Sequence, residues 1–156
     1  MTIRENVSIE LKESMKRKDV DVVNTLRLVI AAIKEKDIVS KGNGNPSGIS
    51  DKEVISLLQT MIKQRNASIE MYIKGKREDL AKKEENEIEI ISSFLPAQLS
   101  AKEIDDIVVA TIKSSEAKSI KDMGKVINLI KNNYNGRMDF GVVSKIIKEK
   151  LTKLWW

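Results

Sequence analysis

The sequence predicts an all-α protein, and three observations lead to this prediction. Hydrophobic residues make up 41% of the chain but aromatic residues only 4%, so the core should consist of aliphatic side chains, which suit packed helices. Proline occurs only at Pro46 and Pro96, which leaves long uninterrupted stretches. Apolar residues recur in these stretches at helical spacing. We expect a four-helix N-terminal lobe (1–95) and a small three-helix C-terminal domain (96–156).

The first two predicted helices are joined by a very short connection. Every fourth residue of the first helix is apolar, which places one apolar face on it: Ile3, Val7, Leu11 and Met15. Cations at 16–18 end this helix, where the macrodipole favours them. Asp19 and Asp21 are start signals for the second helix. Its apolar stripe consists of Val22, Val23, Leu26, Val29, Ile30 and Ile33. The short connection predicts a helical hairpin.

A loop is predicted from Ser40 to Gly48, where glycine, asparagine and proline are concentrated. No strand precedes it and no Lys-Ser/Thr pair ends it, so a phosphate-binding P-loop is not supported. We expect a solvent-exposed connector; a glycine loop that grips a ligand is the alternative.

The third and fourth helices follow this loop. Ser50 and Glu53 form a capping box, which stabilises a helix start by about 1 kcal/mol. The third helix should run to Lys74 and end at Gly75. Its apolar residues cover more than one face: Val54, Leu57, Leu58, Met61, Ile62, Ile69 and Ile73. The fourth helix opens at 78–79, and its buried stripe should be Ile88, Ile91 and Leu95.

The boundary between the two parts is predicted at Pro96, because proline disfavours helix at the preceding residue. A second capping box, Ser100 to Glu103, starts a helix that should end near Lys113. The next short helix starts at Ser119 and ends at residues 135–136, and Asp139 caps the last one. The inward residues of these three helices should be Ile104, Ile107, Val108, Ile112, Met123, Val126, Ile127, Ile130, Phe140, Val143, Ile146, Ile147 and Leu151.

The chain has no cysteine and no histidine, which excludes disulfides, thiolate nucleophiles and imidazole acid–base chemistry. The adjacent acids Asp105 and Asp106 point different ways on a helix, so they do not suit general acid–base work. No metal-ligand cluster has sensible spacing. We therefore assign no catalytic residue, no metal and no cofactor.

No targeting segment or bilayer-spanning run is visible. Residues 1–19 are amphipathic but contain Glu5, Glu10 and Glu13, which transit peptides avoid. The longest run without a charge, residues 90–101, contains Pro96 and is too short to span a bilayer. On this basis we expect a cytoplasmic protein without a membrane partner.

Positive charge is concentrated at the C-terminal end of the chain. From residue 117 onward nine Lys/Arg face three acidic residues, a local net charge of +6, whereas the whole chain carries +5. Such a lobe suggests a polyanionic partner, most simply nucleic acid. If the last two helices pack antiparallel, their cations could converge on the open side of the turn at Gly136, and Arg137 could fork onto a phosphate. The candidate nucleic-acid-binding residues are Lys121, Gly124, Lys125, Lys131, Gly136, Arg137, Lys145 and Lys148. The alternative is that these lysines only keep a small basic domain soluble.

Two further features are unusual. Gly124 lies early in a short helix, where glycine costs roughly 1 kcal/mol relative to alanine. Close helix packing is the favoured explanation, and close approach of a ligand is the alternative. Trp155 and Trp156 end the chain; covering the core is the favoured role over base stacking or a contact between chains.

Several of these strings together resemble the YqeY-like proteins, which are related to the tail domain of the B subunit of the tRNA-dependent amidotransferase. The strings cover nearly the whole chain in order: Arg27-Leu, Lys63-Gln-Arg65, Gly75-Lys-Arg-Glu-Asp-Leu80, Glu87-Ile, Phe94-Leu-Pro-Ala-Gln-Leu-Ser100, Ser119-Ile-Lys-Asp-Met-Gly-Lys125, Asn135-Gly-Arg-Met-Asp139 and Val143-Ser-Lys-Ile-Ile-Lys148. Members often have glycine where this chain has Asn128, and the small residues near 140–141 are shifted or replaced.

The resemblance implies an all-helical protein of two lobes, in the group of carbon–nitrogen ligases with glutamine as amido-N-donor. In the amidotransferase the related tail domain helps to hold tRNA, while the chemistry occurs elsewhere. The positions that carry over for tRNA contact are Gly124, Lys125, Gly136 and Arg137. Nothing here resembles an amidase centre, so the resemblance implies tRNA contact and not catalysis.

Three functions follow as hypotheses. The first is an accessory module that binds tRNA or another structured RNA through phosphates and shape. The second is an enzyme subunit, or a hydrolase acting on aminoacyl-tRNA, which the absence of His and Cys disfavours. The third is a protein–protein adaptor whose positive lobe docks on an acidic partner. The sequence does not specify the RNA or the oligomeric state.

Overall fold

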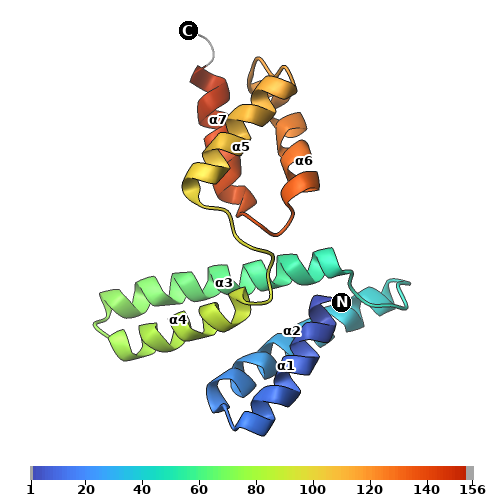
Figure 1. The fold of residues 1–156 in the computed structure, drawn as a ribbon, viewed down its shortest axis with the longest axis vertical. Helices are drawn as coiled ribbons and strands as arrows, with labels where there is room; N and C mark the ends of the chain where they lie inside the picture. The colour runs from blue at the N-terminus through green and yellow to red at the C-terminus, as the bar shows by residue number, and fades with distance from the viewer. Residues whose placement is uncertain (1, 154–156) are drawn as a thin grey trace. The chain divides into compact units, whose positions relative to one another are not determined.

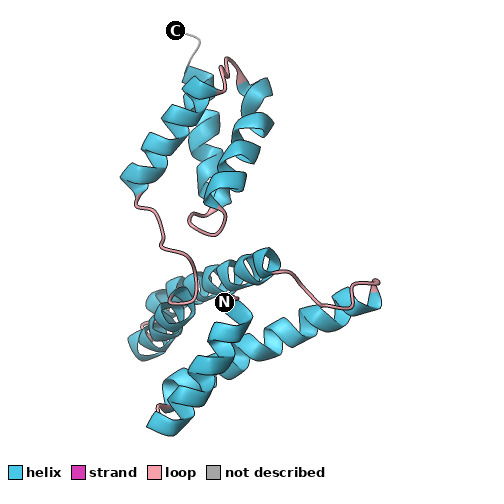
Figure 2. Ribbon diagram, turned by 45° about the vertical axis from the view of Figure 1, so that its right-hand side comes forward, coloured by secondary structure: helices cyan, strands magenta, loops and turns pink. Residues whose placement is uncertain are grey.

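A computed structural model of the chain describes residues 2–153, and in this range the backbone is helix or loop without any β-strand (Figure 2). The prediction of an all-α protein is confirmed. The helices are α1 (Ile3–Arg17), α2 (Val20–Gly42), α3 (Asp51–Lys74), α4 (Glu78–Ser92), α5 (Ala101–Ser114), α6 (Met123–Tyr134) and α7 (Phe140–Lys153), and a short 3-10 turn, η1 (Ile120–Asp122), leads into α6 (Figure 1). The roles proposed for Trp155 and Trp156 concern residues outside the described range.

The chain divides into two compact units, residues 1–95 and 96–156, each with its own core. In the first unit α1 and α2 form one antiparallel hairpin and α3 and α4 form another (Figure 1). Arg65 holds the second hairpin together, because its Nε–H donates to the Glu87 carboxylate at 2.9 Å. All four helices contribute fully buried side chains to this core: Val7, Leu26, Val29, Val54, Leu58 and Ile91.

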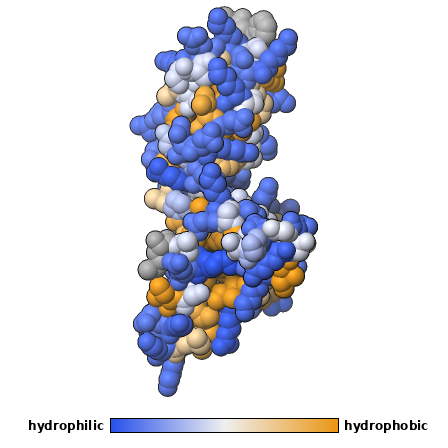
Figure 3. Space-filling view, turned by 90° about the vertical axis from the view of Figure 1, so that its right-hand side faces the viewer, coloured by the Kyte–Doolittle hydropathy of each residue, from blue (hydrophilic) through white to orange (hydrophobic). Residues whose placement is uncertain are grey.

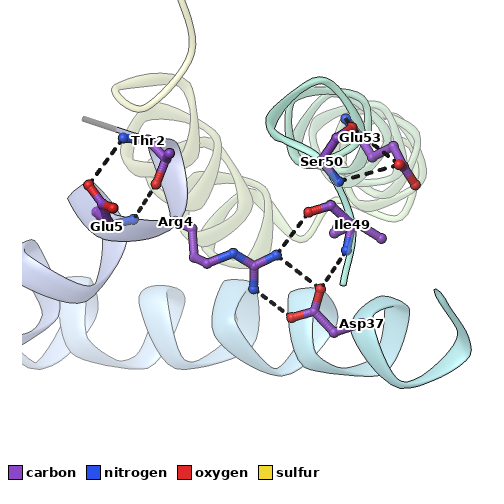
Figure 4. A network of polar contacts seen from close by, with 7 residues as sticks. All are labelled: Thr2, Arg4, Glu5, Asp37, Ile49, Ser50 and Glu53. Carbon is purple, nitrogen blue, oxygen red and sulfur yellow. Dashed lines mark hydrogen bonds and ion pairs between the residues drawn. The ribbon is translucent and has the colours of Figure 1, made fainter. Parts of the chain in front are cut away.

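A polar network ties the start of α1 to α2 and to the segment before α3 (Figure 4). The Arg4 guanidinium donates to Asp37 Oδ1 at 2.9 Å and to Ile49 O at 3.2 Å. The Ile49 N–H donates to the same Asp37 oxygen at 2.9 Å, and the Ile3 N–H donates to Asp51 Oδ1 at 3.0 Å. The Arg4 hydrogen bonds lower the pKa of Asp37 to about 2 although its carboxylate is buried. A charged, fully bonded carboxylate therefore joins three parts of this unit.

Helix α2 extends further than the sequence predicted, because the loop expected from Ser40 begins only after Gly42. The Asn43 N–H still donates to the carbonyl of Ser40 at 3.1 Å. A glycine near a helix end costs at most about 1 kcal/mol relative to alanine, which does not suffice to end the helix. The remaining connector is anchored at its far end by buried Ile49.

Two residues predicted to face the core are exposed instead. Met15 is 44% exposed, because a spacing of four residues drifts by about 40° per step and turns it away from the face of Ile3. Ser14 takes the buried position and donates its hydroxyl hydrogen to Leu11 O at 2.9 Å. Ile73 is exposed because α3 contributes to the core only through residues 54–62.

In the second unit α5, α6 and α7 pack around an aliphatic core, against which the partly buried Tyr134 and Phe140 also pack. Its fully buried members include Val108, Val126, Ile130, Ile147 and Leu151. The predicted capping box from Ser100 to Glu103 is present at the start of α5. A capping box from Ser119 to Asp122 also stands at the start of η1. The helix start predicted there is therefore a 3-10 turn, which α6 follows. Helices α6 and α7 run in opposite directions (Figure 1).

Candidate nucleic-acid interface

All the predicted site residues lie in the second unit: six lie on α6 or just beyond its ends, and Lys145 and Lys148 lie on α7. Helix α6 has 12 residues, so it is about 18 Å long at 1.5 Å per residue. Lys121 and Lys125 lie at its start, near the end of α5, whereas Gly136 and Arg137 follow its other end, near the start of α5 (Figure 1). The structure therefore distributes these residues along the unit and does not gather them around the Gly136 turn.

One flank of α6 lies beside α7. The ammonium of Lys131 lies over the ring of Phe140 at 5.6 Å from its centre, and Phe140 is the first residue of α7. Gly124 and Asn128 precede Lys131 by seven and three residues, a spacing that places all three on the same face of the helix. This face of α6 therefore borders α7.

The flank of α7 that lies away from α5 carries two further lysines, Lys145 and Lys148. Lys150 marks the side of α7 that faces α5, since its ammonium pairs with Asp105 at 2.9 Å. Lys148 lies two residues away, which rotates it by about 200°, and Lys145 shares its face at a spacing of three. Lys145 and Lys148 are both exposed and lie on the flank of α7 away from α5. We call the surface formed by Gly124, Lys131, Lys145 and Lys148 the α6–α7 face.

Gly124 leaves an open position at one end of this face. It is exposed, and a Cβ placed on it would meet no heavy atom of the described residues within 4 Å, apart from its own stretch of helix. The favoured sequence interpretation, that this glycine allows close helix packing, therefore finds no partner in residues 2–153.

The two lysines at the start of α6 differ in their contacts. Lys125 turns toward the end of α5, where its ammonium donates to Ser115 O at 3.0 Å. Lys121 is exposed on η1, which packs against both α6 and α7. Hydrogen bonds from the backbone of Lys118 and Ser119 lower the pKa of Asp122, so a carboxylate stays ionised beside these lysines.

The turn after α6 is closed by the segment that precedes α5. Gly136 is buried and has φ +80°, a conformation that favours glycine. Its carbonyl accepts from the side-chain amide of Gln98 at 2.6 Å, and Arg137 O accepts from the Leu99 N–H at 2.9 Å. Gly136 is therefore a covered residue whose carbonyl is already bonded to the segment before α5.

The Arg137 guanidinium is bound through Nε, whereas its two terminal nitrogens are available to a ligand. Its Nε–H donates to Ala97 O at 3.0 Å, and its guanidinium carbon lies 5.9 Å from the centre of the Tyr134 ring. Between residues 2 and 153 no group accepts from its two terminal nitrogens. The hydrogen bonds of Ser100 and then the charge of Arg137 lower the pKa of Glu103, so this acid also stays ionised nearby.

The predicted cations are not neutralised by salt bridges within the described chain. None of Lys121, Lys125, Lys131, Arg137, Lys145 and Lys148 forms an ion pair there. Figure 3 views the second unit from the side on which α6 lies in Figure 1, and hydrophilic side chains cover most of it. A ligand of this surface would be recognised by charge and hydrogen bonds more than by apolar burial.

Other kinds of site find little support in residues 2–153. No group of three or more Asp or Glu side chains in this range is placed to hold a metal ion. None of the helices traced there has the length and apolar character needed to cross a bilayer.

Sequence reasoning missed Gln98 and Tyr134, which contact the turn that holds Arg137. Gln98 belongs to the string from Phe94 to Ser100 that carries part of the family resemblance, and this string was available as a signal. Its partner lies 38 residues further along the chain, so spacing alone could not reveal the contact.

The comparisons with known proteins agree with the family resemblance. The family described as Yqey-like protein matches residues 4–151. The protein named "Altered inheritance of mitochondria protein 41, mitochondrial" of Pyrenophora tritici-repentis is 29% identical over 144 residues, which cover 90% of this chain and 76% of that protein. Proteins of the same name from Lachancea thermotolerans (30% identical; 79% of this chain, 67% of that protein) and Vanderwaltozyma polyspora (30%; 94% and 70%) also match.

These names contradict one expectation. The prediction of a cytoplasmic protein is wrong by this comparison, because the relatives are named as mitochondrial proteins. The prediction rested on the acidic residues of a short amphipathic segment and on the lack of a visible targeting segment, and such an absence does not specify a compartment.

Proposed function

The chain belongs to the YqeY-like family, and from this premise we propose that its second unit is an accessory module that binds structured RNA, with tRNA as the first candidate. The proposal includes the two-lobe organisation predicted from the sequence. Residues 96–156 act as the binding domain, and residues 1–95 act as a rigid body or a partner surface.

One observation carries this proposal: the α6–α7 face presents Lys131, Lys145 and Lys148, none of which forms an ion pair within residues 2–153, beside the open position at Gly124. Lysines on one exposed surface attract a polyanion and release its counterions. A position without a side chain lets a backbone approach closely. Phosphate groups spaced along a folded RNA suit both features, and RNA helices are recognised chiefly by shape and backbone.

Catalysis is not part of the proposal. The chain lacks the histidine and cysteine that many hydrolases and transferases use, and the acids near the basic residues are bound to backbone N–H groups or capping serines. An enzyme role would therefore require other subunits, as in the amidotransferase that the sequence resembles.

The test is a filter-binding titration of the full chain with total tRNA, with mitochondrial tRNA as a second pool because the relatives are named as mitochondrial proteins. About four phosphate contacts predict a loss of roughly a hundredfold in affinity between about 50 and 200 mM salt. Polyglutamate serves as the control polyanion. Equal retention of tRNA and polyglutamate, or binding that does not respond to salt, would contradict the proposal.

A further inference from the structure

Two segments far apart in the sequence are joined by hydrogen bonds in the second unit. Leu99 N–H donates to Arg137 O at 2.9 Å, and the Gln98 amide donates to Gly136 O at 2.6 Å and to Pro96 O at 2.9 Å. In the other direction Arg137 Nε–H donates to Ala97 O at 3.0 Å. We call residues 96–99 together with 136–137 the clasp.

The clasp controls how the Arg137 guanidinium is presented. An arginine side chain in solution is flexible, and its planar fork binds a phosphate bidentately only in a suitable orientation. Here the inner nitrogen is bound to Ala97 O and one side of the guanidinium lies near the Tyr134 ring. No group in residues 2–153 accepts from the two terminal nitrogens, so both can donate to a ligand.

Gln98 acts on this arrangement indirectly, through the turn that carries Arg137. Its amide joins the carbonyl of Gly136 to that of Pro96, so it fixes the position of the turn relative to the segment that supplies Ala97 O. Gly136 can adopt the backbone conformation that this turn requires, because its φ of +80° costs glycine no strain. Without the Gln98 amide, the hydrogen bonds seen between the turn and this segment in residues 2–153 would be those of the Leu99 N–H and of Arg137 Nε itself.

We infer that the clasp is a subsite for one backbone phosphate of the RNA, with Arg137 as its ligand-contacting group and Gln98 as a positioning residue. The inference rests on the proposed function and deepens it, since it names the chemical group bound and the segment that prepares the site. The segment 96–99 is then part of the binding surface and not only a linker. Glu103 is an acidic neighbour whose pKa is lowered by the Ser100 hydrogen bonds and then by the charge of Arg137, and in residues 2–153 it forms no ion pair with that guanidinium.

The experiment compares four variants of the full chain in tRNA filter binding at several salt concentrations: Gln98→Ala, Arg137→Ala, the double variant and Arg137→Lys. Gln64→Ala is the matched control, because this glutamine is exposed on α3 in the other unit. Thermal melting followed by circular dichroism records the stability of each variant.

If Gln98 acts by positioning Arg137, the variants should show a specific pattern of tRNA affinity and salt slope. Gln98→Ala should weaken binding about fivefold without changing the salt slope, since no phosphate contact carries its charge. Arg137→Ala should weaken binding and lower the slope by about one. The double variant should bind no more weakly than Arg137→Ala, because the amide acts through the arginine. Arg137→Lys should lose most of the affinity while keeping the slope, and Gln64→Ala should bind as the wild type does.

Three outcomes would overturn the inference. They are tRNA binding by Gln98→Ala as tight as that of Gln64→Ala, full addition of the two losses in the double variant, and full affinity in Arg137→Lys. Each would make the clasp purely structural. If Gln98→Ala melts early, Arg137→Lys still decides, because it leaves the segment 96–99 unchanged. A wild type that does not bind tRNA would remove the proposed function itself, whereas loss only in lysine variants of the α6–α7 face would leave that function standing without the clasp.

Discussion

Arg4 and Asp37 form a two-point contact in which both terminal nitrogens of the guanidinium donate to the two carboxylate oxygens. The residues lie 33 positions apart, on α1 and α2. The same carboxylate accepts from the Ile49 N–H just before α3 (Figure 4). One charged pair thus joins the first three helices, and its loss should affect the whole first unit.

Stability at low pH should depend on Asp37. Its pKa is lowered from 3.8 to about 2 by Arg4, so the folded state binds the proton less readily than the unfolded state. The resulting stabilisation is fully present above about pH 4 and is lost as the pH falls toward 2. The contribution is about 2 kcal/mol. Asp37→Asn should remove it, as measured by urea unfolding across this pH range.

The matched control for that measurement is Asp106→Asn, which changes an exposed aspartate of α5. Its unfolding curves should follow those of the wild type near neutral pH. If Asp37→Asn and the wild type lose stability in parallel between pH 5 and 2, the pair with Arg4 does not set the acid response.

Gly48 should be far more sensitive to alanine than its neighbours. It has φ +77°, and a Cβ there would lie 2.3 Å from Asp37 Oδ1. Gly48→Ala should therefore cost about 3 kcal/mol, from backbone strain and from displacement of the carboxylate. Gly44→Ala, with φ +93° and open space, should cost about 1 kcal/mol, and helical Gly42→Ala should be neutral or slightly stabilising. Equal costs at Gly44 and Gly48 in thermal melting would contradict this reading of the Asp37 contact.

The helices could be predicted because their signals are local. The capping boxes at Ser50 and Ser100 and the stop at Gly75 depend on neighbouring residues, and all three are present. The network of Arg4, Asp37 and Ile49 could not be predicted, because it joins three segments that become neighbours only after the helices pack. An aspartate on an amphipathic helix gives no sign that it is buried.

In the candidate site too, local relations could be predicted from the sequence and tertiary contacts could not. Helical spacing places Lys145 and Lys148 on one face of α7, since that relation is local. It did not reveal that Lys125 turns toward Ser115 or that Arg137 is bound by Ala97. The contacts of a long cationic side chain depend on which carbonyls the fold leaves unpaired nearby, and this is a property of tertiary structure.

The lysines of the α6–α7 face should control RNA affinity. Lys145→Ala combined with Lys148→Ala should lower tRNA affinity about tenfold or more near physiological salt and reduce the salt slope by about two. The control is Lys82→Ala with Lys83→Ala, which removes two exposed lysines from α4 in the first unit. If both pairs change affinity and slope alike, binding reflects net charge and no particular face.

Gly124 offers a test in which stability and binding should move in opposite directions. Alanine is favoured over glycine in a helix by up to about 1 kcal/mol, and a Cβ at this position meets no atom of residues 2–153 within 4 Å beyond its own stretch of helix. Gly124→Ala should therefore raise the melting temperature. If an RNA backbone approaches this position closely, the same methyl group should weaken tRNA binding, and Gly124→Leu should weaken it further.

The comparison with Asn128→Ala completes the argument, because this exposed residue is one turn further along the same face of α6. A change at Asn128 alters the helix and its solvation in a similar way but starts from a residue that already has a side chain. Greater stability with unchanged tRNA affinity in Gly124→Ala would show that the open position is not used by the ligand. Lower affinity in the more stable protein cannot arise from unfolding, so that result would place the RNA backbone against α6.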